Sequence, residues 1–251
     1  MANLIRFLSI KFLLVIPVIC IFYSCEKRRD YLFETQLNVV CILRNDEPYP
    51  VAIIDRSYKI DEFAEYDLED ALVYISGPAI VETLFYSGYY NYFQALKPIT
   101  IQAESVYHLS VCAPGFESAT GLTQIPGRFQ IISPLWYDTI SIQDSIIFTK
   151  SRGGAIYHII VSRDEMGIDY YDWYYLPEIS SDTILKVPIM QFYEYITESG
   201  PYEFWIVAHD SNYFNYEFHF GSEPPAYGIE NGTGLFGSAW KEEVKVYVKL
   251  E

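Results

Sequence analysis

The sequence predicts an all-β protein, with an N-terminal immunoglobulin-like sandwich followed by a second β-rich region packed against it. Short apolar or alternating runs recur at sandwich-like spacing, and helical periodicity is almost absent. Aromatic residues make up 18% of the chain and, with β-branched residues, dominate these runs. Turn-forming stretches such as residues 45–48, 76–78 and 113–115 separate the runs.

The first region is the predicted sandwich, over residues 35–132. A length of about 100 residues is typical of the immunoglobulin fold. The acidic segment 61–70 is too short and too charged to belong to the core, so we expect a helix or loop there. The predicted strands are residues 36–44, 49–60, 71–76, 79–86, 92–96 and 106–112.

The second region, residues 133–251, follows a seam at residues 127–133. Its segment 227–239 holds four glycines within ten residues, which permit positive φ and close backbone approach. We expect a buttressing loop there, with Leu235 and Phe236 as a buried plug, and a ligand-binding loop is the alternative. The predicted strands are residues 139–150, 155–162, 168–176, 183–187, 202–209, 212–219 and 243–250.

An export signal opens the chain. Arg6 and Lys11 precede an apolar run at residues 12–23, which is shorter than the roughly 20 residues that a membrane-crossing helix needs. The run ends in Ile-Phe-Tyr-Ser-Cys, which resembles a bacterial lipobox. We therefore expect a signal peptide over residues 1–24, a thioether-linked diacylglycerol on Cys25, with further acylation such as palmitate, and a tether over residues 25–34. A simple signal anchor is the alternative.

The mature chain is strongly acidic. The signal holds two of the 17 basic residues and none of the 33 acidic ones, which leaves a formal charge of −18. Such a charge repels phosphate backbones, so nucleic-acid binding is excluded as a function class. The two cysteines that remain, Cys41 and Cys112, form either a disulfide or two free thiols inside strands.

The glycine-rich segment also supports a resemblance. Asn231 to Gly237 reads Asn-Gly-x-Gly-x-Phe-Gly, residues 50–57 form a Pro-Val strand with an Arg-Ser step, and residues 123–126 form a Thr-x-Ile-Pro exit. Together they resemble a Bacteroidota lipoprotein family, domain of unknown function 4249, although residues 134–200 are short for it. The resemblance implies an outer-membrane location, often beside TonB-dependent receptors, and no enzyme activity. The face of the membrane on which the body lies stays open.

Aromatic clusters at residues 86–93 and 170–175 are candidate binding surfaces, because flat rings stack on sugars and tyrosine hydroxyls add directional bonds. Side chains alternate along a strand, so Tyr170 and Tyr174 share a face with the charged Asp172. We predict that Tyr170 and Tyr174 contact a TonB-dependent receptor or a glycan, while Trp173 packs in the core. Core or edge packing of all these rings is the alternative.

Three tripeptides resemble the Asp-Ser/Thr-apolar acceptor for O-glycosylation in this bacterial group. They make Thr139, Ser145 and Thr183 candidate modification sites. A pattern this loose occurs roughly once by chance in such a chain.

Catalytic and metal signals are missing from the sequence. The four histidines, at positions 108, 158, 209 and 219, lack metal-site spacing, and the acidic residues around Gly167 are read as a solvated turn, with a calcium loop as the alternative. We therefore predict no catalytic residues, no metal and no cofactor. The predicted function is a lipid-anchored, non-catalytic binding or accessory role. The alternatives are a secreted hydrolase acting on glycans and an adhesin-like surface subunit.

Overall fold

A computed structural model of the chain describes residues 34–58, 68–78, 80–163, 170–175, 183–218 and 226–250; for 170–175 it describes the backbone alone. The chain divides into two compact units, residues 1–34 and 35–251. Cys25, the predicted signal peptide and all but the last residue of the predicted tether lie outside the described residues. So do most of the acidic segment 61–70 and the acidic turn at residues 164–169.

The first half of the second unit is built from strands that form one curled sheet. These strands are β1 (Leu37–Arg44), β2 (Val51–Arg56), β3 (Leu72–Gly77), β4 (Ile80–Ser87), β5 (Tyr92–Ala95), β6 (Val106–Cys112) and β7 (Ala119–Gln124). They follow the spatial order β1-β2-β5-β4-β3-β6-β7. Every second residue of β1 is buried, as expected for a strand with one face on a core.

The other half contains β8 (Ile131–Ser133), β9 (Thr139–Ser141), β10 (Ser145–Thr149), β11 (Ile156–Ser162), β12 (Tyr170–Tyr175), β13 (Ile184–Pro188), the 3-10 helix η1 (Ile189–Phe192) and β14 (Gly200–His209). Strands β13, β10 and β8 form a separate three-stranded sheet, and β12, β11 and β14 continue the large sheet. The rings of Phe129, Phe148 and Tyr157 meet in this half, with centroids 5.2 to 5.9 Å apart.

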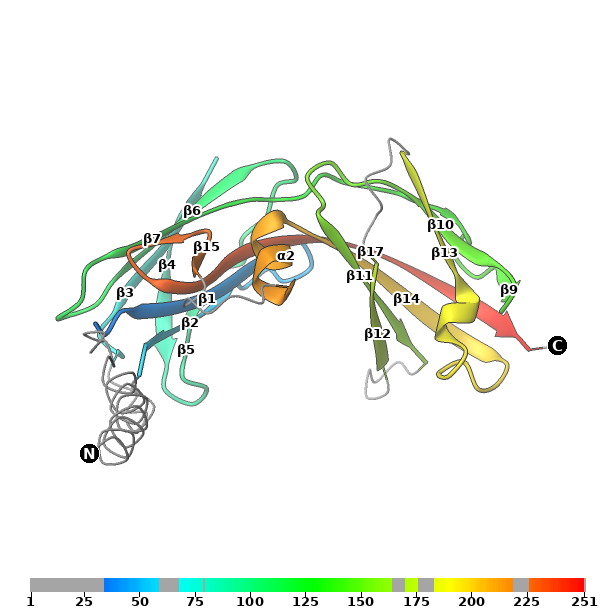
Figure 1. Cartoon of the computed structure of the whole chain (residues 1–251), viewed down its shortest axis with the longest axis horizontal. Coiled ribbons are helices and arrows are strands. Elements are labelled where there is room, and N and C mark those ends of the chain that lie inside the picture. Colours follow the sequence, from blue (N-terminus) through cyan, green and yellow to red (C-terminus); the bar gives the residue numbers. More distant parts are fainter. Residues whose placement is uncertain are drawn as a thin grey trace, which may run out of the picture. The chain divides into compact units, whose positions relative to one another are not determined.

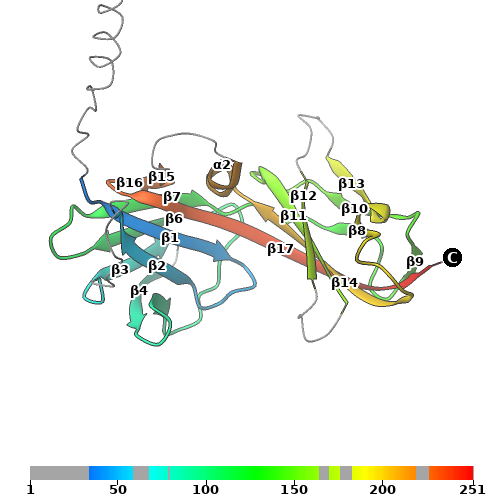
Figure 2. The same ribbon diagram turned by 60° about the horizontal axis from the view of Figure 1, so that its bottom comes forward.

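One long strand, β17 (Thr233–Lys249), belongs to both halves (Figures 1 and 2). Its first residues pair in parallel with β1, and its later residues pair with β14 and with β9. The short strands β15 (Ala226–Tyr227) and β16 (Ile229–Glu230) pair with β17 and β7. All residues after 132 were expected in the second region, yet these later segments also complete the sheet of the first.

The predicted all-β class, with a sandwich followed by a second β-rich region, is confirmed. Most predicted strands lie within a few residues of the observed ones. Three differences stand out. The predicted strand at 139–150 is two strands, β9 and β10, because the Asp144 carboxylate accepts the Ser141 N–H and closes a turn. Strands β7, β8, β15 and β16 were not predicted as strands.

The predicted strand at 212–219 is wrong, because residues Ser211–Phe218 form the α-helix α2. Aromatic residues favoured the strand prediction. The Asp210 side chain instead accepts the N–H of Tyr213 at 2.9 Å, and its carbonyl accepts the N–H of Phe214 at 3.1 Å. The Asp210 side chain thus satisfies one of the donors that a helix start leaves free, and its carbonyl accepts the first regular hydrogen bond of the helix, so Asp210 is the N-cap that starts α2.

The glycine-rich segment is not a loop ahead of the last strand, because from Thr233 onward it is itself part of β17. The predicted burial of Leu235 and Phe236 is confirmed. Gly234 has a φ of 104°, and a Cβ there would overlap the carbonyl oxygen of Val39 on β1. A glycine is therefore required where β17 approaches β1.

Cys41 and Cys112 are free thiols, the first buried and the second half-buried. Burial raises the pKa of Cys41 to about 12, and the charge of Glu47 acts in the same direction. Within the described part of the chain, no helix is long and apolar enough to cross a membrane.

Candidate functional site

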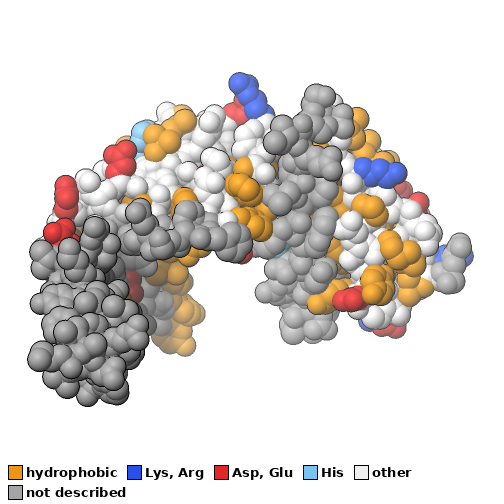
Figure 3. All heavy atoms as spheres, viewed as in Figure 1, with side chains coloured by type: hydrophobic (Ala, Val, Ile, Leu, Met, Phe, Trp, Pro, Cys, Tyr) orange, Lys and Arg blue, Asp and Glu red, His pale blue; other side chains and the backbone are white. Residues whose placement is uncertain are grey.

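Three consecutive large apolar side chains are exposed in the loop between β8 and β9. Leu135, Trp136 and Tyr137 keep 62%, 48% and 77% of their surface in contact with solvent. Apolar side chains reach the surface in several patches on the face drawn in Figure 3. Single exposed apolar residues are ordinary, but a consecutive run is unusual unless it has a function. We call these three residues the 135–137 ridge.

Hydrogen bonds hold the backbone of the ridge in place. The Asp138 carboxylate accepts the N–H of Leu135 at 2.8 Å, and the N–H of Asp138 donates back to the Leu135 carbonyl at 3.1 Å. The N–H of Tyr137 donates to the Lys245 carbonyl at 2.6 Å, and that of Tyr247 donates to the Asp138 carbonyl at 2.9 Å. The ridge is therefore pre-organised, which lowers the entropy that a ligand must remove on binding.

The two rings of the ridge form a corner. The centroids of Trp136 and Tyr137 are 5.9 Å apart, and the ring planes meet at 63°. Tyr137 has a φ of 67°, in the left-handed region that is uncommon for residues with a side chain. Such backbone strain is often found at binding sites, and here it turns the tyrosine ring outward.

Two hollows adjoin the ridge, one lined by Leu135 and Trp136 and the other by Tyr137. The first has a volume of about 420 Å³, and Trp136 forms part of its wall together with Arg128, Glu242 and Glu243. The second has a volume of about 330 Å³ and is lined by residues that include Tyr137, Arg163, Glu203, Lys245 and Tyr247. Both volumes are in the range of small-molecule sites.

Charged groups in the first hollow have partners of their own. Glu243 pairs with Lys241 at 3.0 Å, and Glu242 accepts the indole N–H of Trp240 at 2.9 Å. The guanidinium of Arg128 lies over the Trp240 ring, 5.3 Å from its centroid.

Charged groups in the second hollow also have partners of their own. Lys245 lies 3.7 Å from Glu203, and Arg163 forms an ion pair with Glu198. Both hollows therefore offer hydrogen-bond donors and acceptors without a strong net charge.

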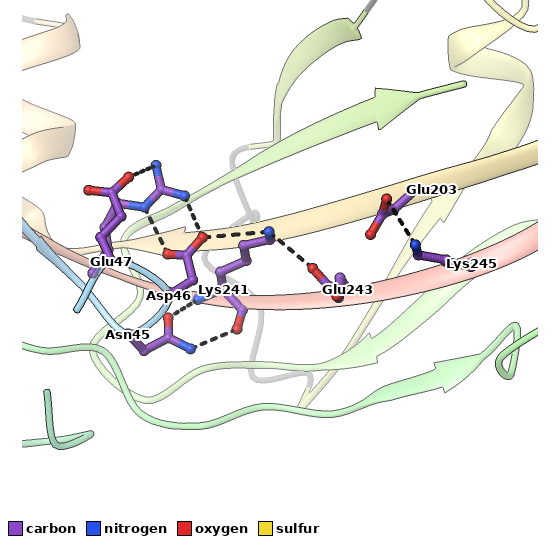
Figure 4. A network of polar contacts seen from close by, with 8 residues as sticks. Asn45, Asp46, Glu47, Glu203, Lys241, Glu243 and Lys245 are labelled. Atoms are coloured by element: carbon purple, nitrogen blue, oxygen red, sulfur yellow. Dashed lines mark hydrogen bonds and ion pairs between the residues drawn. The ribbon is translucent and has the colours of Figure 1, made fainter. Parts of the chain in front are cut away.

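A second polar cluster joins β17 to the loop after β1 (Figure 4). Lys241 lies 3.5 Å from Asp46 and 3.0 Å from Glu243, and its ammonium group is 4.1 Å from the centroid of the Trp205 ring. Arg44 binds both carboxylate oxygens of Asp46, at 2.8 and 3.0 Å. Every charged group drawn in this cluster faces an opposite charge within the cluster. We therefore assign the cluster the role of holding the two halves of the body together.

Electrostatics agree with that assignment. Burial alone would raise the pKa of Asp46, but the hydrogen bonds and charge of Arg44, with help from Lys241, hold it below its ordinary value. The carboxylate is thus ionised and paired, as in a structural ion pair.

A third cluster, buried at the start of α2, combines hydroxyls with a carboxylate. Thr123 Oγ1 lies 2.5 Å from Asp210 Oδ2 and 2.9 Å from Ser238 Oγ, and Ser238 also donates to the Gln124 carbonyl. A serine nucleophile needs a base within hydrogen-bond reach. Neither ring nitrogen of the adjacent His209 makes a hydrogen bond. The Asp210 carboxylate that contacts both hydroxyls also caps α2, so we assign the cluster to holding α2 against β7 and β17.

His209 is buried against Tyr213, with ring centroids 3.8 Å apart. Burial lowers its pKa to about 3, and His158 and Arg44 act in the same direction. The ring of His158 lies 6.1 Å away on the neighbouring strand, a proximity that the sequence did not indicate. Among the described residues, no three His, Cys, Asp or Glu side chains are grouped to hold a metal ion.

The predicted binding pair lies on strand β12. In the register with β11, Tyr170 is opposite Ser162 and Tyr174 is opposite His158, which places both positions on one face of the sheet. Their side chains, and that of Trp173, lie outside the described residues. The prediction that Tyr170 and Tyr174 contact a partner therefore stays a prediction.

The predicted modification sites are spread over the second half. Thr139 is exposed on β9, directly after the ridge, Thr183 is exposed just before β13, and Ser145 is half-buried at the start of β10. The Asp138 that would precede a modified Thr139 is also the residue that clamps the ridge.

The ridge itself was not among the aromatic clusters predicted from the sequence, which were residues 86–93 and 170–175. The signal was present, since Leu-Trp-Tyr is an apolar run enclosed by Pro134 and Asp138. Both flanking residues favour turns, and an apolar run in a turn cannot be buried by strand pairing.

Comparisons with known proteins give little for this chain. No family model matches it, and no curated protein matches it. Solved structures with similar arrangements include the fibronectin(III)-like modules of Clostridium thermocellum CbhA, at 11% identity over 84% of this chain and 94% of that one, with a TM-score of 0.26.

Two others are three N-terminal domains of the bacteriophage RB49 outer capsid protein Hoc (12% identity, 87% and 71% coverage, TM-score 0.27) and the tandem Ig repeats of Dlar (11%, 87% and 100%, TM-score 0.25). These TM-scores are low, so the fold and the site above rest on the chain's own strand pairing and contacts.

Proposed function

We propose that this chain is a lipid-anchored, non-catalytic binding protein of the bacterial cell envelope, and that its ligand binds across the 135–137 ridge. The observation that carries the proposal is the ridge, in which three consecutive large apolar side chains are exposed on a clamped backbone. Rigid aromatic residues contribute contact area at low entropic cost, which is why they dominate binding surfaces.

The position of the ridge along β17 supports an anchored binding role. Thr233 contacts the carbonyl of Leu37, close to where the body begins, whereas Lys245 holds the ridge through Tyr137. These two positions of β17 are twelve residues apart, or roughly 40 Å along a strand. The ridge is therefore held at the end of β17 remote from the strand's contact with Leu37.

A binding role also fits the chemistry of the hollows better than hydrolysis does. A glycoside hydrolase needs two convergent carboxyl groups. Glu242 and Glu243 are neighbours on a strand and so point to opposite faces, and each is engaged by another side chain. The resemblance noted in the sequence supports an outer-membrane location, with a TonB-dependent receptor or a glycan as the partner.

The anchor is tested by replacing Cys25 with serine and labelling cells with a fatty-acid probe. We expect label on the wild type and none on Cys25→Ser, which should leave the membrane fraction. Label that persists, or a mature N-terminus elsewhere, would refute the lipid anchor.

Binding at the ridge is tested with a photo-crosslinking benzoylphenylalanine at position 136, in cells that export the protein. The matched control places the same group at Tyr49, which is 45% exposed in the loop between β1 and β2. We expect discrete adducts from position 136 and none from position 49. Adducts that are missing at 136, or identical at both positions, would contradict the proposal.

A further inference from the structure

We infer that the ligand of the 135–137 ridge is an uncharged glycan, held as a single soluble chain. The inference rests on the proposed function and deepens it by naming the class of ligand. It follows from the shape of the ridge, the two hollows and the charges that line them.

The ring geometry favours a single chain. A sugar ring has an apolar face that packs on an aromatic ring and hydroxyls around its edge that remain free to form hydrogen bonds. Trp136 and Tyr137 present their rings at 63° to each other, so both cannot lie on one plane. A flat crystalline polysaccharide surface would contact only one of them. A free chain, whose successive units turn relative to one another, can contact both.

The two hollows extend the surface offered by the ridge. Trp136 lines the hollow of about 420 Å³, and Tyr137 lines the hollow of about 330 Å³. A chain that crosses the ridge would therefore place one segment in each hollow. Tyr247, which is exposed on β17, adds a further ring to the second hollow.

The charges decide against an anionic polymer. Arg163, Lys245, Glu203 and Glu243 each face an opposite charge. Arg128 and Glu242, which contact Trp240 instead, carry opposite charges within the first hollow, so neither hollow presents a cluster of cations for a polyanion. The mature chain also carries a formal charge of −18, which repels polyanions.

The same groups disfavour an apolar protein partner, since covering them without hydrogen bonds is costly. Sugar hydroxyls both donate and accept hydrogen bonds, and they can satisfy arginine and carboxylate groups at once. An uncharged glycan is the ligand class that suits the rings and the polar walls together.

The test uses the full chain in detergent and affinity electrophoresis through gels that contain one polysaccharide each. The uncharged probes are a soluble β-glucan, an α-glucan, a mannan and a xylan; polygalacturonate is the anionic probe. Crystalline cellulose is tested by co-sedimentation. We expect retardation by at least one uncharged probe, and neither retardation by polygalacturonate nor sedimentation with cellulose.

Variants locate the site. We expect Trp136→Ala and Tyr137→Ala each to weaken retardation at least tenfold, and Trp136→Phe to keep part of it because a ring remains. Tyr49→Ala changes a ring of similar exposure, 45% against 48% for Trp136, in the loop between β1 and β2 and should bind as the wild type does. Melting curves confirm that each variant is folded, which we expect because the ridge side chains are largely exposed.

The inference is overturned if no uncharged probe retards the protein, if polygalacturonate or cellulose binds instead, or if the ridge variants bind as well as the wild type. Its failure is distinguishable from failure of the proposed function. Protein adducts at position 136 without glycan binding would leave a binding protein with a different ligand. No adducts and no retardation would remove both.

Discussion

The backbone N–H of Tyr137 donates a hydrogen bond to the carbonyl oxygen of Lys245 at 2.6 Å. This bond fastens the ridge to β17, and two residues later β9 pairs in parallel with the end of the same strand. Farther back on β17, Lys241 contacts Asp46 and Gly234 packs against β1. The position of the ridge therefore depends on contacts made by β17 in both halves of the protein.

Gly234→Ala should destabilise the protein by about 2 kcal/mol or more. The native φ of 104° is strained for alanine, and the added Cβ overlaps the backbone oxygen of Val39, which cannot move as a flexible side chain would. Urea unfolding of the purified variant measures the change.

Gly237→Ala is the matched control. Its φ is not in the positive region, and the nearest atom to an added Cβ is a flexible methyl group of Leu235 at 3.1 Å. We expect a change within about 1 kcal/mol. Equal losses of stability in the two variants would show that the close approach of Gly234 to β1 is not the reason why a glycine is needed there.

Asp210→Ala should cost about 2 to 4 kcal/mol. The change removes the N-cap of α2 and leaves the buried hydroxyls of Thr123 and Ser238 without their carboxylate partner. Asp210→Asn keeps an oxygen for the Tyr213 N–H and should retain most of the stability. A free energy of unfolding that falls equally in the asparagine and alanine variants would contradict the capping role.

The two Asp210 variants also differ from the wild type in pH dependence. Burial raises the pKa of Asp210, so the native state binds a proton more tightly than the unfolded state does. This contribution to stability is present in acid and is lost as the pH rises through the native pKa. As the pH falls, the free energy of unfolding of the wild type should therefore rise relative to that of Asp210→Asn.

Asp46→Asn should show the opposite dependence of stability on pH. Its native pKa is lowered, so the contribution of the ion pair to stability is present above the ordinary pKa of aspartate and is lost as the pH falls through the native value. We expect a cost of about 1 kcal/mol at neutral pH, because the pair is partly exposed, and little difference in strong acid. Unfolding curves at several pH values distinguish the contribution of Asp46 to stability from that of Asp210.

Much of the fold was predictable because the information for it is local. The alternation of buried residues in Leu37, Val39, Cys41 and Leu43 is visible in the sequence, and so are the turns between strands. The parallel pairing of β17 with β1 was not predictable, because it joins residues almost 200 positions apart. Local patterns set strands and turns, while the partner of each strand depends on contacts that the sequence does not display.

The site was less accessible to sequence reasoning, and the reason is again physical. A pattern search treats Trp136 and Tyr137 as core candidates, because apolar residues are usually buried. Their exposure is set by the Asp138 clamp and by the bond from Tyr137 to Lys245, which links residues 108 positions apart. Helix α2 was missed for a similar reason, since the Asp210 cap outweighed the strand propensity of the aromatic residues.

The last prediction concerns the strained backbone of Tyr137. Its φ of 67° costs a residue with a side chain about 1 kcal/mol or more, but costs glycine almost nothing. Tyr137→Gly should therefore be more stable than Tyr137→Ala by about 1 kcal/mol. Since the ring is mostly exposed, neither variant should lose much packing, yet both should lose glycan retardation.

Position 136 provides the control, because Trp136 is not among the residues with positive φ. There the order should reverse, with Trp136→Ala more stable than Trp136→Gly. Glycine relieves no strain at position 136, and it raises the entropy of the unfolded chain, which lowers the stability of the variant. Urea unfolding of all four variants, alongside affinity electrophoresis, separates strain from binding. If alanine proves as stable as glycine at position 137, the strain does not exist in solution; if the glycine variant still binds, the tyrosine ring is not part of the ligand site.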